Sequence, residues 1–290
     1  MQKIYRIREF HLGKQGYPAK LAPLPDPPQQ ILVMGQPLGK LLSRPAVAIV
    51  GSRKVTAYGK AVTTKLAGEL AERGVVIISG LAFGVDSIAH RAALEANGTT
   101  IAVLPSSLNA IYPSVHYQLA HQILEQGGAL VTEYPDNTKP HKYHFVARNR
   151  IVSGLADGVL ITEAADKSGT LHTANFALDQ GKEVMAVPGN ITSPLSLGTN
   201  QLIKTGATAV TNVSDILRAL GLEAAESKKK AVAASAEEAA ILDLLEDGAA
   251  ETEVILAKSG LELAIFNQTL TMLEITGKIN PVGSGQWMLA

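Results

Sequence analysis

The sequence contains no cysteine, few aromatic residues and no excess of either charge. Aromatic residues make up 4% of the 290 positions, and 26 Lys and Arg balance 26 Asp and Glu. Without cysteine the chain can form no disulfide, thiolate nucleophile or Cys-ligated metal centre. It also lacks an apolar signal segment at its start and any apolar run near the ~20 residues that cross a bilayer. These absences predict a cytoplasmic protein without membrane insertion.

The charges are unevenly distributed along the chain. Residues 1–45 have seven basic and two acidic side chains, a net charge of +5, whereas residues 236–290 have two basic and nine acidic ones, a net charge of −7. The body between them is close to neutral. We therefore expect no global field toward a polyanion, and any nucleic-acid contact has to come from a local basic patch.

From Pro45 to Leu220, short apolar runs alternate with amphipathic segments. Because the runs are apolar throughout, both faces of the sheet that they form are covered. Strand–helix alternation of this length predicts an α/β fold with a doubly wound parallel sheet over residues 45–220. The predicted strands are Val47–Val50, Val75–Ser79, Thr100–Leu104, Ala129–Thr132, Gly158–Thr162 and Glu183–Val187. The predicted helices between and after them are 57–73, 87–97, 115–126, 146–156, 170–180, 199–204 and 213–220.

The two ends of the chain follow other patterns. Residues 1–44 form a basic, Pro-rich lead-in in which Ile31–Met34 is predicted as an edge strand. Residues 221–235 are predicted as a linker. Residues 236–290 contain three short helical patterns and two short strands around a Gly-Ser-Gly turn, which predicts a small C-terminal winged-helix domain.

One stretch, residues 139–154, combines four Lys or Arg with two His and two aromatic rings, and no carboxylate interrupts it. Cations that meet phosphates, interleaved with rings that meet bases, are what a single-strand nucleic-acid site requires. A solvated loop that leads into a helix explains the same composition, so the stretch alone leaves both interpretations open.

Loops rich in small residues follow several predicted strands. Gly51, Ser52 and Arg53 follow the first strand, and Arg53 is a candidate phosphate ligand. Ser168, Gly169 and Thr170 open a helix, where free N–H groups can meet an anion. Turns need Gly and Ser for structural reasons as well, so each loop alone is ambiguous.

The histidines do not have the spacing of a metal site, and no set of nucleophile, base and orienting group is present. We therefore expect no metal, no cofactor and no enzyme activity. Asp86 and His90 are four residues apart and could pair, but a helix cap and a half-buried imidazole are the favoured explanation.

Over residues 17–220 the sequence resembles the DNA-processing protein A (DprA/Smf) family. The matching motifs occur in order along the whole α/β body. They are Tyr17-Pro, Asp26-Pro-Pro28, Ala48-Ile-Val-Gly-Ser-Arg53, Tyr58-Gly59, Ser79-Gly-Leu-Ala-Phe-Gly-Val-Asp86, Ala89-His90, Ala102-Val-Leu104, Tyr112-Pro113, Glu133-Tyr-Pro135, Phe145, Arg148-Asn-Arg150, Glu163-Ala164, Ser168-Gly-Thr170, Ala186-Val-Pro-Gly189, Gly198-Thr-Asn200 and Asp215-Ile-Leu217.

The resemblance implies an extended Rossmann-like domain that binds and protects single-stranded DNA, forms a homodimer and loads RecA recombinase during natural transformation. It assigns phosphate contacts to Arg53 and Lys142 and a base contact to Phe145. Arg148 and Arg150 are further DNA-binding candidates, although they lie on different faces of a helix and one of them is expected to be structural. Gly198–Ile203 is a candidate dimer edge.

Some positions depart from the family pattern. Only some sixteen residues precede Tyr17, where the family usually has a helical module, and Pro105–Leu108 replaces a glycine-containing turn. Ser114 stands where a basic residue often follows the Tyr-Pro pair, and His172 replaces an aliphatic residue.

One enzyme class shares this type of sheet, the Lonely-Guy (LOG) type nucleotide phosphoribohydrolases. Their Pro-Gly-Gly-x-Gly-Thr-x-x-Glu motif would place a catalytic Glu at position 173, which is Thr173 here.

The acidic C-terminal domain has no Lys or Arg in its third predicted helix, 261–276, so we expect it not to bind duplex DNA by itself.

Overall fold

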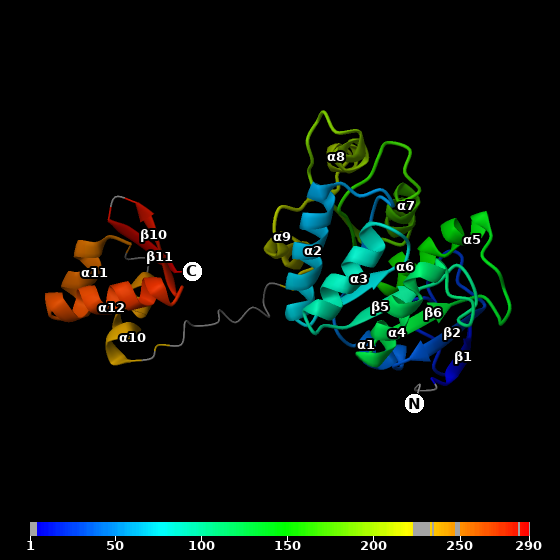
Figure 1. Ribbon diagram of the computed structural model, residues 1–290, viewed down its shortest axis with the longest axis horizontal. Coiled ribbons are helices and arrows are strands. Elements are labelled where there is room, and N and C mark those ends of the chain that lie inside the picture. Colours follow the sequence, from blue (N-terminus) through cyan, green and yellow to red (C-terminus); the bar gives the residue numbers. More distant parts are fainter. Residues whose placement is uncertain (1–4, 223–232, 234, 247–249, 284, 290) are drawn as a thin grey trace. The chain divides into compact units, whose positions relative to one another are not determined.

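The computed structural model describes residues 5–222, 233, 235–246, 250–283 and 285–289. The chain divides into two compact units, residues 1–223 and 224–290 (Figure 1). Each unit has its own hydrophobic core, and they are described separately. In the described residues no helix is both long and apolar enough to cross a membrane.

Unit 1 is built on a nine-stranded sheet with the order β1-β2-β6-β5-β4-β3-β7-β8-β9. From β6 to β9 all neighbouring strands are parallel, and the strand order reverses between β3 and β7. The strands are β1 (Ile7–His11), β2 (Gln30–Gly35), β3 (Ala46–Val50), β4 (Val76–Ser79), β5 (Thr100–Val103), β6 (Ala129–Thr132), β7 (Gly158–Ile161), β8 (Glu183–Ala186) and β9 (Thr208–Ala209). The predicted doubly wound, Rossmann-like sheet is thus confirmed as a mostly parallel one.

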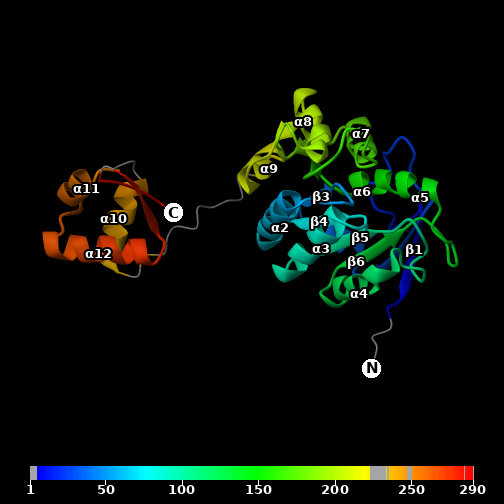
Figure 2. The same ribbon diagram turned by 45° about the horizontal axis from the view of Figure 1, so that its top comes forward.

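Helices cover both faces of this sheet (Figure 2). Alternate residues of β3 point to opposite sides: Val47 and Ile49 pack with α2 and α3, while Ala48 and Val50 belong to the core that includes α6 and α7. The helices of unit 1 are α1 (Leu38–Leu41), α2 (Ala57–Glu72), α3 (Val85–Glu95), α4 (Tyr117–Glu125), α5 (Lys142–Ala147), α6 (Asn149–Leu155), α7 (Leu171–Asp179), α8 (Leu197–Lys204) and α9 (Val213–Ala219), with 3-10 turns at Ser114–His116 and Pro194–Ser196. Every strand from β3 to β7 is buried on both faces, as its continuous apolar run predicts.

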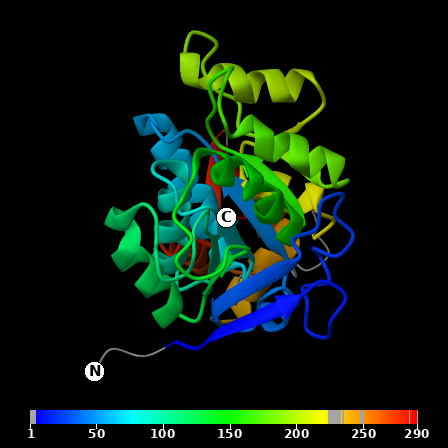
Figure 3. The same cartoon turned by 90° about the vertical axis from the view of Figure 1, so that its right-hand side faces the viewer.

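The N-terminal segment differs from the sequence-based expectation. Ile31–Met34 lies in β2, which is not at the edge but between β1 and β6, antiparallel to both. The edge strand is β1, which lies beside β2 in blue in Figure 3. Leu21 and Leu24 of the Pro-rich segment are buried in the core under α6. The lead-in is therefore packed into unit 1. Most of the predicted linker, 221–235, lies outside the described residues.

Unit 2 has three helices followed by a two-stranded antiparallel hairpin, the order predicted for a winged helix. Phe266, Leu273 and Ile279 are buried in its core, together with Ile241 and Ile255. The elements are α10 (Ala236–Glu246), α11 (Thr252–Ser259), α12 (Leu263–Ile275), β10 (Ile279–Gly283) and β11 (Gln286–Leu289).

Candidate nucleic-acid interface

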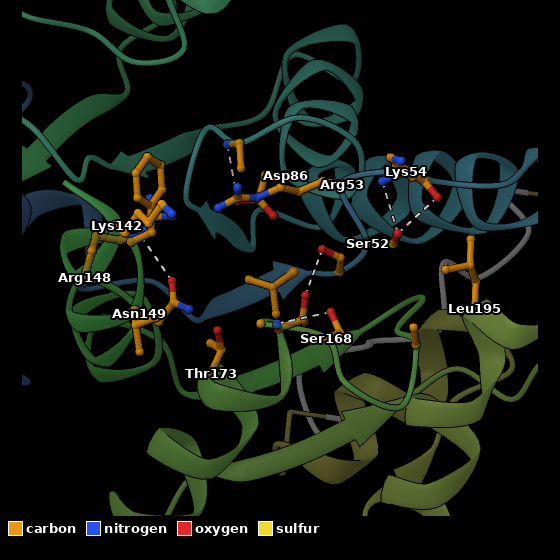
Figure 4. Close-up of a pocket in the computed structure, with 18 of the residues that line it drawn as sticks. Ser52, Arg53, Lys54, Asp86, Lys142, Arg148, Asn149, Ser168, Thr173 and Leu195 are labelled. Carbon is orange, nitrogen blue, oxygen red and sulfur yellow. Dashed lines mark hydrogen bonds between the residues drawn. The ribbon is translucent and has the colours of Figure 1, made fainter. Parts of the chain in front are cut away.

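A pocket of about 660 Å³ opens at the carboxyl ends of β3 and β7 (Figure 4). This is the point where the strand order reverses, which is where open parallel sheets bind their ligands. Its walls come from the loops after β3, β4, β5 and β7 and from α5 and α6. Nine of the ten predicted site residues line it: Gly51, Ser52, Arg53, Lys142, Phe145, Arg148, Ser168, Gly169 and Thr170. The tenth, Arg150, is not among the lining residues.

The loop after β3 is held so that two cationic side chains project from it. The backbone N–H of Ser52 donates to the carbonyl of Glu163 at 2.7 Å. The hydroxyl of Ser52 accepts from the N–H of Lys54 at 3.1 Å and donates to the Lys54 carbonyl at 3.0 Å. Ser52 is buried in this turn, while Arg53 and Lys54 remain exposed. Ser52 therefore shapes the loop, and the basic side chains that follow it face the pocket.

Gly51 is required by close packing beneath the same loop. A Cβ at this position would lie 2.6 Å from Val85 Cγ2 and 2.8 Å from the Glu163 carbonyl oxygen. Any larger residue would push the loop away from α3 and from the end of β7. The motif glycine thus sets how deeply the loop sits in the fold.

Arg53 and Phe145 meet inside the pocket, although they are 92 positions apart in the sequence. The Arg53 guanidinium carbon lies 5.1 Å from the centroid of the Phe145 ring, within the range of a cation–π contact. Tyr112 approaches the same ring edge to face, with centroids 5.5 Å apart and planes at 74°. No carboxylate of the described residues forms an ion pair with Arg53, Lys54 or Lys142. These cations are therefore available to an anionic ligand.

Lys142 is the first residue of α5, and the rings of neighbouring residues fix this short helix. The His141 N–H donates to His144 Nδ1 at 3.3 Å, and the His144 ring packs on Tyr134 with centroids 4.0 Å apart. Burial, and then the neighbouring His141, lower the pKa of His144. At neutral pH its ring is therefore uncharged and Nδ1 can accept. This contact holds Lys142 and Phe145 at the mouth of the pocket.

The loop after β7 is joined to the loop after β3. The Thr170 hydroxyl donates to the Gly51 carbonyl at 2.9 Å, and the Thr170 N–H donates to the Ser168 hydroxyl at 3.2 Å. Both hydroxyls thus have partners within the protein, and Gly169 between them is exposed. Thr170 precedes α7, so the positive end of that helix dipole lies at the pocket rim.

Arg148 is buried in the pocket floor. It donates to the carbonyls of Gly80, at 2.6 Å, and Val103, and its Nε donates to the Asn149 side chain at 3.2 Å. Burial lowers the pKa of Arg148 to about 10, so the group stays charged at neutral pH. A Cβ at Gly80 would lie 2.3 Å from this guanidinium, which explains the glycine. Arg148 braces the ends of β4 and β5.

Asp86 faces Arg148 in the same floor. Its carboxylate accepts from the N–H groups of Gly80 at 3.1 Å and Ala82 at 3.4 Å. Burial raises the pKa of Asp86, and the Arg148 guanidinium opposes that shift. The suggested Asp86–His90 pair is not formed, since His90 is fully buried with Nδ1 at 2.6 Å from the Thr100 hydroxyl. Asp86 therefore supports the loop after β4.

Arg150 has a structural position in unit 1, away from the pocket lining. Its Nη atoms donate to both Glu133 carboxylate oxygens at 2.7 and 2.8 Å, and its Nε donates to the Asp26 carbonyl at 2.9 Å. The side chain is 9% exposed. The expectation that Arg150 contacts DNA is not supported by this placement. Its position agrees with the alternative that one of the two motif arginines is structural.

The sequence reasoning did not single out three polar or aromatic residues that line the pocket: Lys54, Tyr112 and Asn149. Lys54 directly follows Arg53, Tyr112 belongs to the Tyr-Pro motif and Asn149 lies between the two motif arginines, so all three had a sequence signal. The departures from the family pattern lie elsewhere: Ser114 and His172 are exposed and neither lines the pocket.

The family model described as DNA recombination-mediator protein A matches residues 10–221. The chain belongs to this family. A second model, the DprA winged helix domain, matches residues 223–285, which confirms the predicted fold of unit 2.

Relatives are found in several bacteria. Protein Smf of Escherichia coli is 50% identical over 204 residues, which are 70% of this chain and 54% of that protein. DNA processing protein DprA of Bacillus subtilis is 41% identical over 214 residues, 74% of this chain and 71% of that protein. The chain thus spans about half the length of the E. coli relative.

Two solved structures resemble the chain closely. DNA processing protein A of Streptococcus pneumoniae aligns with a TM-score of 0.68 and 39% identity, covering 73% of this chain and 74% of that one. DNA processing protein A of Helicobacter pylori, reported for its single-stranded DNA binding mode, aligns with a TM-score of 0.66 and 36% identity, covering 74% and 96%.

Proposed function

We propose that this member of the DprA family binds single-stranded DNA in the pocket at the carboxyl ends of β3 and β7 and acts as a recombination mediator. The observation that carries the proposal is the meeting of Arg53 with Phe145 beside the exposed Lys142. Cations for the phosphates and a ring for a base, side by side in one groove, are the elements of a single-strand site. The H. pylori relative, reported for its single-stranded DNA binding mode, supports the same proposal.

The roles follow from the chemistry of each side chain. Arg53 and Lys142 contact phosphates, and Phe145 contacts a base. Ser52, Gly51 and Ser168–Thr170 hold the two loops that carry these groups in place. Arg148, which faces Asp86, braces the floor of the pocket and does not need to touch the ligand.

The test is a titration of the full chain with single-stranded and duplex DNA at two salt concentrations. We expect a preference for the single strand. Phe145→Ala should weaken binding roughly 10- to 100-fold, since stacking on an aromatic ring contributes about 1–3 kcal/mol per base. The slope of the logarithm of the binding constant against the logarithm of the salt concentration is called the salt slope here. Arg53→Ala and Lys142→Ala should each reduce its magnitude by about 0.7 per lost phosphate contact.

The matched control is Arg91→Ala, which removes an exposed cation on α3 that does not line the pocket. This variant should bind as the parent does. If the combined Arg53, Lys142 and Phe145 variant binds poly-dT as tightly as the parent, the site lies elsewhere and the proposal is wrong.

We further propose that the chain protects the bound strand, forms a homodimer and loads RecA. The candidate dimer face is Gly198–Ile203, which forms most of α8; next to it Leu197 is 46% exposed, and Ile191 in the preceding loop is 83% exposed. Light scattering over a concentration series tests the dimer, with Leu197→Glu expected to shift it to monomer. Strand exchange with RecA and a single-strand-binding protein tests the loading.

The rival proposal is a LOG-type phosphoribohydrolase. Among the described residues lining the pocket, Asp86 is the one carboxylate, and its oxygens face Arg148 and two backbone N–H groups. Thr173, at the position of that family's glutamate, is buried in the pocket wall. We therefore propose a non-enzymatic role. Release of free base from nucleoside monophosphates would overturn it.

A further inference from the structure

Five rings lie on the loop after β4 and on the segment that runs from the loop after β5 into α4. We call this set the aromatic ledge and define it as Phe83, Tyr112, His116, Tyr117 and His121. Phe83 is 49% exposed, Tyr112 43% and Tyr117 49%. Rings of this size are seldom left in water without a partner when they lie close together.

The ledge is held rigidly from below. His116 is buried, and its Nδ1 lies 2.8 Å from the Leu81 carbonyl oxygen, which ties the segment after β5 to the loop after β4. Phe83 packs on the His116 ring with centroids 5.1 Å apart. Tyr117 packs on His121, one helical turn further along α4, at 4.4 Å. A rigid set of rings binds a flat ligand without a large ordering cost.

The ledge is continuous with the pocket. Tyr112 belongs to both, because it lines the pocket and contacts the Phe145 ring. Ala82 lines the pocket, and Phe83 is its neighbour in the chain, with Cα atoms about 3.8 Å apart. The ledge therefore shares Tyr112 with the pocket and adjoins it in the chain at Ala82.

The absence of charged residues from the segments of the ledge determines which part of a DNA strand it can contact. Residues 96–124 contain no Asp, Glu, Lys or Arg, and neither do residues 79–85. The two segments that carry the ledge therefore supply no cation for a phosphate and no carboxylate that repels one, and within the ledge only Tyr112 shares the pocket with Arg53 and Lys142. Aromatic rings without neighbouring charges suit the faces of bases, which stack on them with little regard to sequence.

We propose that the single strand extends from the pocket along the aromatic ledge, with bases stacked on Phe83 and Tyr117 and phosphates toward solvent. This inference rests on the proposed function of the pocket. It divides the site into two parts with different physics: a cationic pocket that grips phosphates, and an uncharged ledge that holds bases and lengthens the footprint.

The test compares oligothymidylates of about five and about fifteen nucleotides, within the range of single-strand site sizes. Phe83→Ala and Tyr117→Ala should each weaken binding of the longer strand about 5- to 100-fold and change binding of the shorter strand little. The salt slope should stay that of the parent, because no phosphate contact is lost. An abasic extension of the short strand should gain nothing in affinity.

Two further variants check the reasoning. Val115→Ala removes an exposed aliphatic side chain from the same segment without removing a ring, and it should bind as the parent does. Phe83→Trp keeps a ring and should retain affinity for the longer strand.

If both alanine variants bind the longer strand like the parent, the inference is wrong and the rings serve another partner, such as a protein. A flatter salt slope in these variants would also overturn it, since it would indicate a phosphate contact. Failure of the parent to bind the short strand would count against the pocket itself and overturn the inference with it.

Discussion

Arg150 is the residue of the basic stretch 139–154 for which a structural role and a DNA contact can be told apart most clearly by experiment. Its guanidinium joins three segments: Glu133 after β6, Asp26 in the Pro-rich segment, and the carbonyl of Ala147 at the end of α5. We predict that Arg150→Ala destabilises unit 1 and leaves the salt dependence of DNA binding unchanged.

The magnitude follows from the burial of the pair. The side chains of Arg150 and Glu133 are 9% and 15% exposed, so removing the arginine leaves a largely buried carboxylate without its partner. Breaking such a pair from one side costs about 3–5 kcal/mol. For a unit of this size, each kcal/mol lowers the melting temperature by about 2–4 °C. We therefore expect the melting temperature to fall by about 6–20 °C.

The assay is thermal and urea unfolding of the full chain, followed by salt-dependent titration of single-stranded DNA at a temperature where the variant is folded. Arg91→Ala is the matched control, and its stability should change by less than about 0.5 kcal/mol. Adding Glu133→Gln to Arg150→Ala should restore part of the loss, because the stranded charge is removed. An unchanged melting temperature together with a flatter salt slope would refute the structural role.

Three further predictions concern other parts of the chain. Burial, followed by the charges of neighbouring groups, lowers the pKa of His90 to about 3, so the unfolded state binds more protons as the pH falls. This group alone should lower the free energy of unfolding by about 2 kcal/mol from pH 7 to pH 5, as urea melts will measure. His90→Gln should remove this contribution, while the exposed His172→Gln should leave it unchanged. Glu163→Ala should cost about 1–3 kcal/mol in the same melts, because its carboxylate accepts both the N–H and the hydroxyl of Thr56 at the start of α2. Residues 230–290 alone should show no sub-micromolar duplex binding in a gel shift, since they are acidic and α12 has no Lys or Arg.

The sequence predicted the central strands well, because a strand buried on both faces has a continuous apolar run. It missed β1, where Arg8 and Glu9 interrupt the apolar pattern of an edge strand. Among the site residues, the spacing after each strand brought Arg53 and Thr170 to the correct edge of the sheet. The sequence did not reveal that Arg150 is buried, unlike the exposed cations at the mouth of the pocket. A charged side chain is buried only beside a partner, and the partner Glu133 is distant in sequence.

The balance of charge in the pocket bears on how a neutral chain would bind the single-stranded DNA proposed as its ligand. Among the described residues that line it, Arg53, Lys54, Lys142 and Arg148 are cationic, and Asp86 alone is anionic. Exposed charges more than a Debye length away, about 8 Å at physiological ionic strength, are largely screened, so this local excess and not the zero net charge of the chain sets the field at the pocket. Asp86 and Arg148 oppose each other in the floor, so the exposed excess belongs to the three cations at the mouth. The affinity of the pocket should therefore respond to Arg53, Lys54 and Lys142, and hardly at all to the acidic residues elsewhere in the sequence.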